Sequence, residues 1–173
     1  DCEELILKKE LITTNLKNSK NSNQVFLGNW CNSNNRIIPY HWTKIKKIEK
    51  DYKYINNLNQ KFLKSISRIM NKHHNINRSY KYWNIILGPW LNITITTLFD
   101  KWSNLKKINK RQIFTKEFRI DKKDLIPLDF GEFLENLNSD VWNNYFYTKI
   151  LKFKNYDVRK SKQKLKIKKK TIY

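Results

Sequence analysis

The chain has 173 residues, and 36 lysines and arginines against 15 aspartates and glutamates give it a formal net charge of +21. That length suits one domain or part of a larger one, and 39% hydrophobic with 14% aromatic residues exclude a fully disordered chain. Because there is no run of 18 apolar residues and no secretory signal pattern, we expect neither a transmembrane helix nor a signal peptide.

The first part of the chain predicts a short strand, an extended segment and one long helix. Residues 1–17 form a lead-in, and residues 18–23, which carry no apolar side chain, form a loop. The apolar run 24–28 predicts a buried strand that turns at its closing glycine. Residues 37–42 predict an extended segment, because proline keeps the residue before it out of helical angles. A helix is predicted over residues 43–71, whose apolar face comprises Ile45, Ile48, Tyr52, Ile55, Leu58, Phe62, Ile66 and Ile69.

A second helical region contains a proline. Ser79 is a candidate N-cap for it. Proline lacks a backbone donor and clashes with the carbonyl four residues earlier, so Gly88-Pro89 predicts a kink or a fresh start with Pro89 at the first helical position. Residues 91–105 then carry a second apolar stripe at helical spacing.

The C-terminal part predicts a strand over residues 113–120, a polar connector over 121–129 and a helix from about residue 140. One face of the strand is expected to carry Phe114, Phe118 and Ile120. Residues 152–173 are mainly basic, and we expect them to form a solvated tail or the start of a linker. The predicted fold class is α/β, dominated by helices.

The positive charge has two explanations. Of the 36 basic residues 30 are lysine, and the chain has 23 asparagines, 21 isoleucines and no alanine, which is the usage that AT-rich codons favour. Specific nucleic-acid recognition would favour arginine, whose planar fork binds phosphate and guanine through two hydrogen bonds. We therefore favour the explanation that surface positions have drifted toward lysine in an AT-rich genome, which leaves the protein a weak affinity for polyanions. We do not expect nucleic acid as the partner.

The chain carries no cofactor or metal motif. Gly28, Gly88 and Gly131 are too far apart for a phosphate-binding loop. The adjacent His73 and His74 would point about 100° apart on a helix and could not share a metal. The two cysteines cannot complete a four-cysteine zinc site, and we expect reduced thiols. No cofactor and no metal are therefore expected.

Three tryptophans stand at breaks in the predicted elements. Trp30 follows the glycine turn after the first strand, Trp42 follows the extended segment, and Trp90 follows the Gly-Pro pair. Loops at the ends of elements build the sites of α/β proteins, and aromatic faces beside polar residues suit stacking on sugar rings or bases. Large aromatic residues also fill protein cores, and that alternative stays open for each of them.

Three polar residues are candidates for site chemistry. His41 is the candidate for proton transfer because imidazole titrates near neutral pH, the alternative being a hydrogen-bonded structural histidine. Asp100 is either a functional buried carboxylate or an ion-pair partner of Lys101 or a nearby arginine. Asp51, within the lysine-rich helix, is expected to be a charge partner.

Several short strings in fixed order carry a resemblance to a known family. They span residues 11–16, 26–31, 39–42, 51–54, 82–91, 99–102, 129–130 and 140–144, and include Pro39-Tyr40-His41-Trp42 and Phe99-Asp100-Lys101-Trp102. Together they resemble the N-terminal region of bacterial surface-carbohydrate (O-antigen-region) transferases. The chain departs from that pattern at Asn29, where a glutamate is usual, at Thr43-Lys44, where acidic residues are usual, and at Asn84, where an arginine is usual. The lost charges would weaken a catalytic or phosphate-binding role at these positions.

The resemblance implies a two-lobed, GT-B-like glycosyltransferase of which residues 1–151 are an incomplete acceptor-side lobe. Family members look several times longer, and their C-terminal lobe would bind the nucleotide-sugar donor. The chain, which begins with Asp rather than Met, would then be a fragment that is inactive alone. Its reaction would be sugar transfer to a glycan or lipid-linked acceptor during cell-surface polysaccharide synthesis. A cytoplasmic location is expected, with lysines of the long helix near the anionic surface of the inner membrane. The alternatives are a basic nucleic-acid-binding module and an inactive remnant.

Within this hypothesis, individual residues take the following roles. His41 would act as general base and Asp100 would orient or charge the site. The acceptor pocket would be shaped by Asn29, Trp30, Trp42, Trp83 and Trp90. This assignment expects the breaks at Trp30, Trp42 and Trp90 to converge on one concave face.

Overall fold

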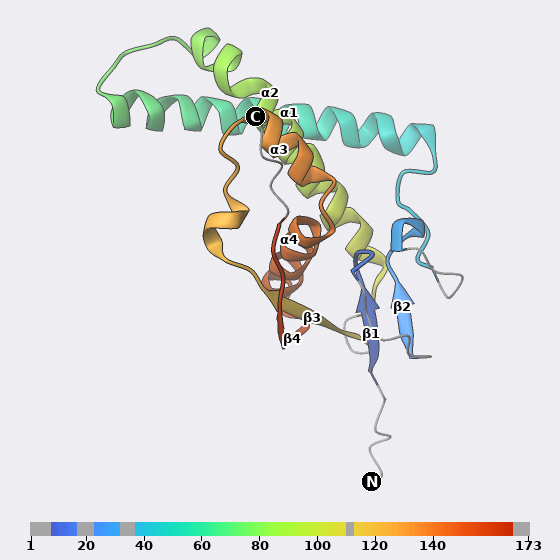
Figure 1. Ribbon diagram of the computed structural model, residues 1–173. Helices are drawn as coiled ribbons and strands as arrows, with labels where there is room; N and C mark the ends of the chain where they lie inside the picture. The colour runs from blue at the N-terminus through green and yellow to red at the C-terminus, as the bar shows by residue number, and fades with distance from the viewer. Residues whose placement is uncertain (1–7, 17–22, 32–36, 110–112, 168–173) are drawn as a thin grey trace. The chain divides into compact units, whose positions relative to one another are not determined.

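The computed structural model in Figure 1 describes residues 8–16, 23–31, 37–109 and 113–167. The chain divides into two compact units, which we call the sheet unit (residues 1–40 and 101–173) and the helical unit (residues 41–100). The strands are β1 (Lys9–Ile12), β2 (Gln24–Phe26), β3 (Ile113–Arg119) and β4 (Asp157–Lys164). The α-helices are α1 (Ile45–His74), α2 (Tyr80–Asn104), α3 (Phe130–Leu137) and α4 (Asp140–Phe153), with short 3₁₀ turns η1 (Asn29–Cys31), η2 (Leu105–Lys107) and η4 (Lys122–Leu125). The predicted α/β class with a majority of helix is confirmed.

The helical unit is built from α1 and the greater part of α2. The long helix predicted over residues 43–71 is confirmed as α1, which ends at Asn75 in the left-handed conformation (φ 51°, ψ 45°) that asparagine tolerates well. The predicted cap of the second helix is also confirmed, because the backbone N–H of Tyr82 donates to Oγ of Ser79 at 3.2 Å. The two helices share a core of Ile55, Leu63, Leu91 and Ile95. Ile55, Leu91 and Ile95 belong to the predicted apolar faces, but the buried Leu63 does not. Most of the apolar face predicted for α1 is exposed instead, namely Ile45, Ile48, Tyr52, Phe62 and Ile69.

Of the two outcomes predicted at Gly88-Pro89, a kink or a fresh start, the fresh start is wrong, because α2 continues as one helix from Tyr80 to Asn104 with Pro89 inside it. Proline removes the N–H that would bond the carbonyl of Ile85. Ile85 is 71% exposed and Pro89 is exposed as well, so water can take the place of the missing donor. The helix therefore tolerates the proline on its solvent side.

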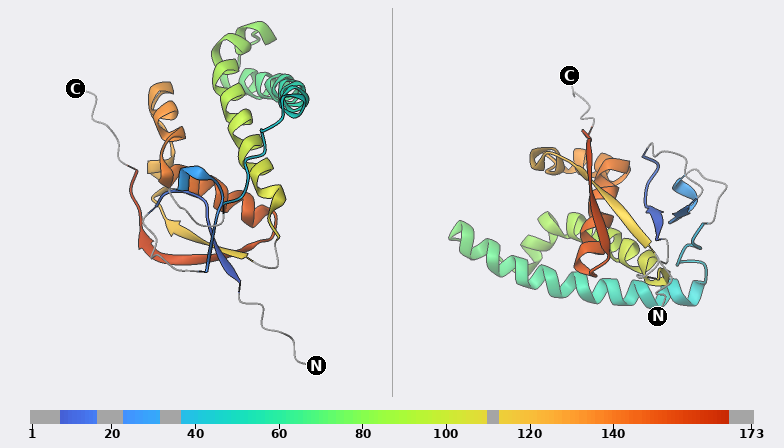
Figure 2. Two further views of the ribbon diagram at one scale, coloured as in Figure 1. Left: turned by 90° about the vertical axis from the view of Figure 1, so that its right-hand side faces the viewer. Right: turned by 90° about the horizontal axis from the view of Figure 1, so that it is seen from below.

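The sheet unit holds a four-stranded parallel sheet in the order β2-β1-β3-β4. The chain leaves β1 to form β2 on one side and later adds β3 on the other side, so the strand order reverses at β1. Helix α4 packs against β3 and β4, and α3 packs against α4, an arrangement that can be followed in Figure 2. The core beneath the sheet includes Leu11, Leu27, Leu105 and Leu151, each almost fully buried.

Three elements of this unit were not expected from the sequence. Part of the predicted lead-in forms β1, part of the segment after the polar connector forms α3, and part of the predicted basic tail forms β4. The signal for α3 is a capping box. Asp129 accepts a hydrogen bond from the backbone N–H of Glu132 at 2.7 Å, and the carboxylate of Glu132 accepts one from the N–H of Leu128 at 2.7 Å. An Asp-x-x-Glu string before an apolar run therefore marks the start of this helix.

The basic segment after residue 152 is not a solvated tail over its whole length. Asp157–Lys164 forms β4 and pairs in parallel with β3. Its lysines are exposed, while Asp157 pairs with Lys8 at 3.0 Å and with Arg159 at 3.1 Å. A lysine-rich sequence suits a strand at the edge of a sheet, because the backbone supplies the pairing and the charges discourage association with another edge.

The predicted strand over residues 113–120 is confirmed as β3, but its buried face differs from the one expected. Ile113, Thr115 and Phe118 are buried, whereas Phe114 is only partly buried. The register of β3 with β4 shifts between Glu117 and Arg119. An irregularity of this kind interrupts the alternation of side chains, so a strict period of two predicts the wrong face.

Candidate functional site

His41 and Asp100 are in contact although 59 positions separate them in the sequence. His41 precedes α1 and Asp100 lies in α2, and the packing of the helical unit leaves 2.9 Å between Nε2 of His41 and Oδ1 of Asp100. The side chain of His41 is 2% exposed and that of Asp100 is 23% exposed. The pair therefore has a buried imidazole end and a carboxylate end that solvent reaches.

Aromatic rings enclose the imidazole of His41. The centroid of the Trp42 ring lies 4.5 Å away and that of Phe99 lies 6.4 Å away. Burial lowers the pKa of His41 below its ordinary value near 6.5, and the hydrogen bond and charge of Asp100 oppose this shift without cancelling it. The imidazole is therefore neutral at pH 7, which is the form that accepts a proton.

A second carboxylate, Asp51, faces the other side of the imidazole. Its Oδ2 is 4.0 Å from Nδ1 of His41 and accepts a hydrogen bond from the indole N–H of Trp42 at 2.9 Å. Burial disfavours the ionised form of Asp51, but hydrogen bonds from Lys47 and Trp42 outweigh it and lower the pKa of this carboxyl. The expected role of Asp51 as a charge partner is confirmed.

A groove lies beside this cluster, between α1 and α2. It has a volume of about 270 Å³ and is lined by Trp42, Ile48, Tyr52, Ile55, Asn56, Asn92 and Thr96. Asn92, Thr96 and Asp100 are spaced by four residues on α2, so they lie on one face of the helix in successive turns. The groove thus combines two aromatic side chains with two amides and the hydroxyls of Tyr52 and Thr96, and the partly exposed carboxylate of Asp100 lies one helical turn beyond Thr96.

Trp30 lies in the sheet unit, at the turn after β2. Its indole N–H donates to the carbonyl of Thr13 at 3.1 Å, and its ring meets Tyr40 edge-on at 6.1 Å. A Cβ at Gly28 would lie 2.2 Å from Cζ3 of Trp30, so the glycine permits the close approach of the ring. Asn29 begins η1, and its side chain lies outside the described part of the structure. Since Trp42 and Trp90 belong to the helical unit, the convergence of all three breaks stays a prediction.

Trp83 and Trp90, the other two tryptophans of the predicted site, do not line the groove. Trp83 is 4% exposed, and its indole N–H donates to Oδ1 of Asn71 at 2.8 Å, which ties α2 to the end of α1. Trp90 is 39% exposed on α2. The structure therefore brings together His41, Trp42 and Asp100 from the predicted set, while the buried position of Trp83 is that of a core residue.

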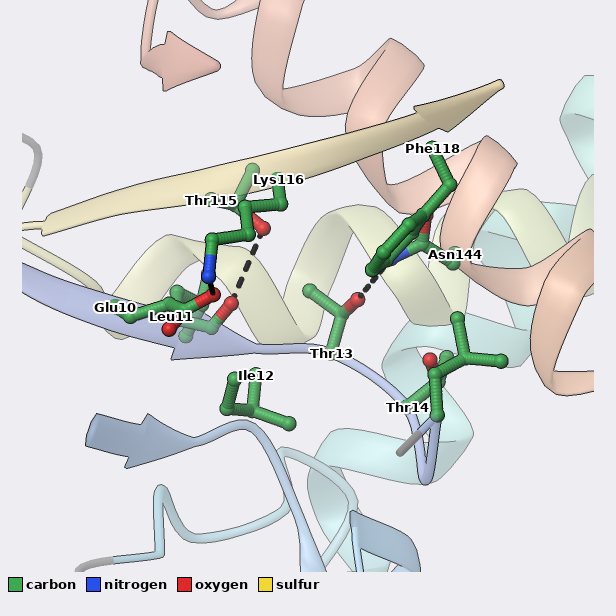
Figure 3. Close-up of a pocket in the computed structure, with 10 residues that line it drawn as sticks. Glu10, Leu11, Ile12, Thr13, Thr14, Thr115, Lys116, Phe118 and Asn144 are labelled. Carbon is green, nitrogen blue, oxygen red and sulfur yellow. Dashed lines mark hydrogen bonds and ion pairs between the residues drawn. The ribbon is translucent and has the colours of Figure 1, made fainter. Parts of the chain in front are cut away.

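A polar crevice at the carboxyl end of β1 was not predicted, and Figure 3 shows its side chains. Lys116 pairs with Glu10 at 2.9 Å, the hydroxyl of Thr115 donates to the carbonyl of Leu11 at 3.1 Å, and Nδ2 of Asn144 donates to the hydroxyl of Thr13 at 3.2 Å. In parallel sheets a ligand commonly binds where the strand order reverses. Here the polar groups are hydrogen-bonded to one another across the crevice, so they join β1 to β3 and α4.

Two further features concern metal ions and membranes. Of the residues that the structure describes, no group of three histidine, cysteine, aspartate or glutamate side chains is arranged to hold a metal ion. Over the same ranges, no helix has both the length and the apolar composition that crossing a bilayer requires.

Comparison with known proteins gives one match. The model of a family described as LIC12162 family transferase matches residues 9–173. No curated protein and no solved structure matches the chain significantly. The family match covers the His41–Asp100 contact, the groove beside it and the parallel sheet, and it agrees with the transferase part of the resemblance carried by the tryptophan-containing strings. The chain belongs to the LIC12162 family of transferases.

Proposed function

We propose that this chain is the acceptor-side part of a glycosyltransferase that moves a sugar from a nucleotide-sugar donor to a glycan or lipid-linked acceptor. The observation that carries the proposal is the contact between His41 and Asp100 beside an aromatic groove. A transferase of this kind must bind a sugar ring and remove a proton from its hydroxyl, and the two features supply these two functions side by side.

The groove suits a carbohydrate because of the groups that line it. The rings of Trp42 and Tyr52 offer faces on which the C–H side of a sugar ring can stack, and the indole of Trp42 is held by its bond to Asp51. Asn56, Asn92 and Thr96 offer hydrogen-bonding groups for sugar hydroxyls. A few polar groups in a mainly apolar site are typical of small-ligand sites.

The proton step is assigned to Asp100 with the help of His41. Sequence analysis assigns direct proton transfer to His41, but only 2% of its side chain is exposed, so the exposed end of the pair is the better candidate to meet an acceptor. The carboxylate of Asp100 would accept the proton of the acceptor hydroxyl as the oxygen attacks the donor sugar. His41, bonded to the other end of the pair, would hold the carboxylate in place.

The remaining parts of the proposal rest on the resemblance. Donor binding belongs to a second lobe of a GT-B-like enzyme, and the product belongs to cell-surface polysaccharide synthesis. The exposed lysines of α1 would keep the protein at the cytoplasmic face of the inner membrane, where each basic residue near an anionic surface contributes about 1 kcal/mol.

The groove is tested by titrating the chain with soluble oligosaccharides built from glucose, galactose and N-acetylglucosamine while following tryptophan fluorescence. We expect saturable binding that Trp42→Ala and Tyr52→Ala each weaken at least tenfold. Phe62→Ala is the matched control, because Phe62 is an aromatic residue of α1 that is 51% exposed and does not line the groove. Failure of every oligosaccharide to bind, or equal weakening by the control, contradicts the acceptor role.

Transfer itself is measured in lysates of cells that express the gene, from labelled nucleotide sugars to membrane-bound acceptor. Asp100→Asn should lower the rate about 10²–10⁴-fold, as expected for loss of a general base, and should leave oligosaccharide binding intact. Asp124→Asn, in the sheet unit, removes the same charge and should leave the rate unchanged. Full activity of Asp100→Asn contradicts the proposed base.

A further inference from the structure

A second pocket lies in the sheet unit, at the carboxyl end of β3. It has a volume of about 360 Å³, and its walls come from β3, η4, α4 and β4. Phe118, Ile120 and Leu125 form its apolar lining. In parallel α/β sheets the carboxyl ends of strands are the usual place for a ligand, so the position of this pocket is itself informative.

Four cations line this pocket, and each comes from a different element: Arg119 from β3, Lys122 from η4, Lys149 from α4 and Lys160 from β4. The pocket holds one carboxylate, Glu117, which contacts Lys149 at 3.9 Å and is also bound by Lys152. Within the described ranges, no ion pair joins Arg119, Lys122 or Lys160 to a carboxylate. Positive charge therefore exceeds negative charge inside the pocket.

Uncharged donors complete the set of groups that an oxyanion would meet. Tyr145 and Ser161 both line the pocket and bring hydroxyl groups. The ammonium of Lys149 lies 5.0 Å from the centroid of the Tyr145 ring, which holds this lysine against the wall. Arginine adds a planar fork that can bind two oxygens of one phosphate, and hydrogen bonds between such charged groups are strong.

We propose that this pocket binds a phosphate or diphosphate group. Four cations that converge on one cavity repel each other, and an anion with several charges relieves that repulsion while its oxygens accept hydrogen bonds from the pocket. The group can belong to a soluble phosphate ester or to a lipid headgroup, and the chemistry of recognition is the same for both. The site lies wholly within the sheet unit and does not depend on the acid–base pair of the helical unit.

The probe is inorganic pyrophosphate, titrated into the full chain by calorimetry at 50 mM salt. We expect one saturable site, and we expect the double variant Lys122→Gln/Lys160→Gln to bind at least tenfold more weakly. The matched control is Lys50→Gln/Lys64→Gln on α1, which removes the same charge from two exposed lysines outside the pocket. Because all four lysines are exposed, both variants should unfold at the temperature of the unmodified chain.

The outcomes separate a built site from general attraction to a basic protein. Absence of saturable binding, or equal weakening in both double variants, overturns the proposal. A second titration uses phosphatidylcholine vesicles with and without phosphatidic acid. If the pocket variant weakens binding to the acidic vesicles as well as to pyrophosphate, the phosphate belongs to a lipid; if it weakens only pyrophosphate binding, the phosphate belongs to a soluble ligand. Binding to acidic vesicles without binding to pyrophosphate also overturns the proposal.

Discussion

At the scale of single residues, His41 links the candidate site to the stability of the fold. Its pKa lies below the ordinary value because the ring is buried, with Asp100 opposing the shift. As the pH falls through about 6.5, the unfolded chain takes up a proton that the folded chain resists, so the free energy of unfolding should fall. His41→Gln should make this decrease less steep while still offering Asp100 an amide donor.

The measurement is urea unfolding, followed by far-UV circular dichroism, between pH 7.5 and pH 5.5. His73→Gln is the control, because His73 is an exposed histidine at the end of α1, and its variant should keep the pH dependence of the unmodified chain. An unchanged slope in His41→Gln would show that burial of this imidazole does not govern the decrease.

Individual residues also show which site predictions the sequence could support. The sequence marks His41 for its titration near neutral pH and Asp100 as a carboxylate that is either functional or an ion-pair partner, and it offers a structural role for each. Their contact required two helices to pack, and no local pattern predicts that. Trp83 and Trp42 both occur in strings that carry the family resemblance, yet Trp83 is buried against the end of α1 while Trp42 lines the groove. Residue type alone could not distinguish them.

At the scale of elements, Pro89 destabilises α2, and a substitution can remove this destabilisation. Pro89 leaves one backbone carbonyl of the helix without its donor, and proline in a helix interior costs about 3 kcal/mol relative to alanine. Pro89→Ala should therefore raise the free energy of unfolding by ~1–3 kcal/mol, measured by urea unfolding. Lys81→Ala, at an exposed position in the first turn, should change it by less than about 0.5 kcal/mol. A destabilised Pro89→Ala chain would mean that the packing of α2 needs the geometry that proline imposes.

Local signals predicted some elements well and others not at all. The apolar stripe of α1 and the serine before α2 are patterns within a few residues, and both elements appear where they are predicted. Strands β1 and β4 have no such pattern, because β4 pairs with β3 and β1 pairs with both β2 and β3, so their partners lie in other segments of the chain. The lysine content of β4 resembles that of a solvated tail, and only the pairing with β3 distinguishes the two.

At the scale of the whole molecule, the net charge of +21 opposes the compact state. The seven ion pairs that join lysine or arginine to a carboxylate among the described residues include several exposed ones, which salt weakens, but repulsion among 36 basic residues should be the larger effect. Raising sodium chloride from 20 to 200 mM shortens the screening length severalfold. The melting temperature should rise by several degrees, equivalent to ~1–2 kcal/mol.

Sorbitol at matched osmolality is the control for effects of the solute that do not involve charge, and it should raise the melting temperature less than the salt does. A melting temperature that falls with salt would show that the ion pairs contribute more to stability than the repulsion removes.

By itself, the sequence determined the α/β class, the long amphipathic helix, the Ser79 cap of α2 and the excess of positive charge, because these follow from composition and from contacts a few residues apart. Only the tertiary structure decided the order of the strands, the contact of His41 with Asp100 and the gathering of Arg119, Lys122, Lys149 and Lys160 around one pocket. Each of these joins segments that are distant along the chain. Their meeting depends on how apolar faces pack, and the spacing of residues within one segment carries no information about it.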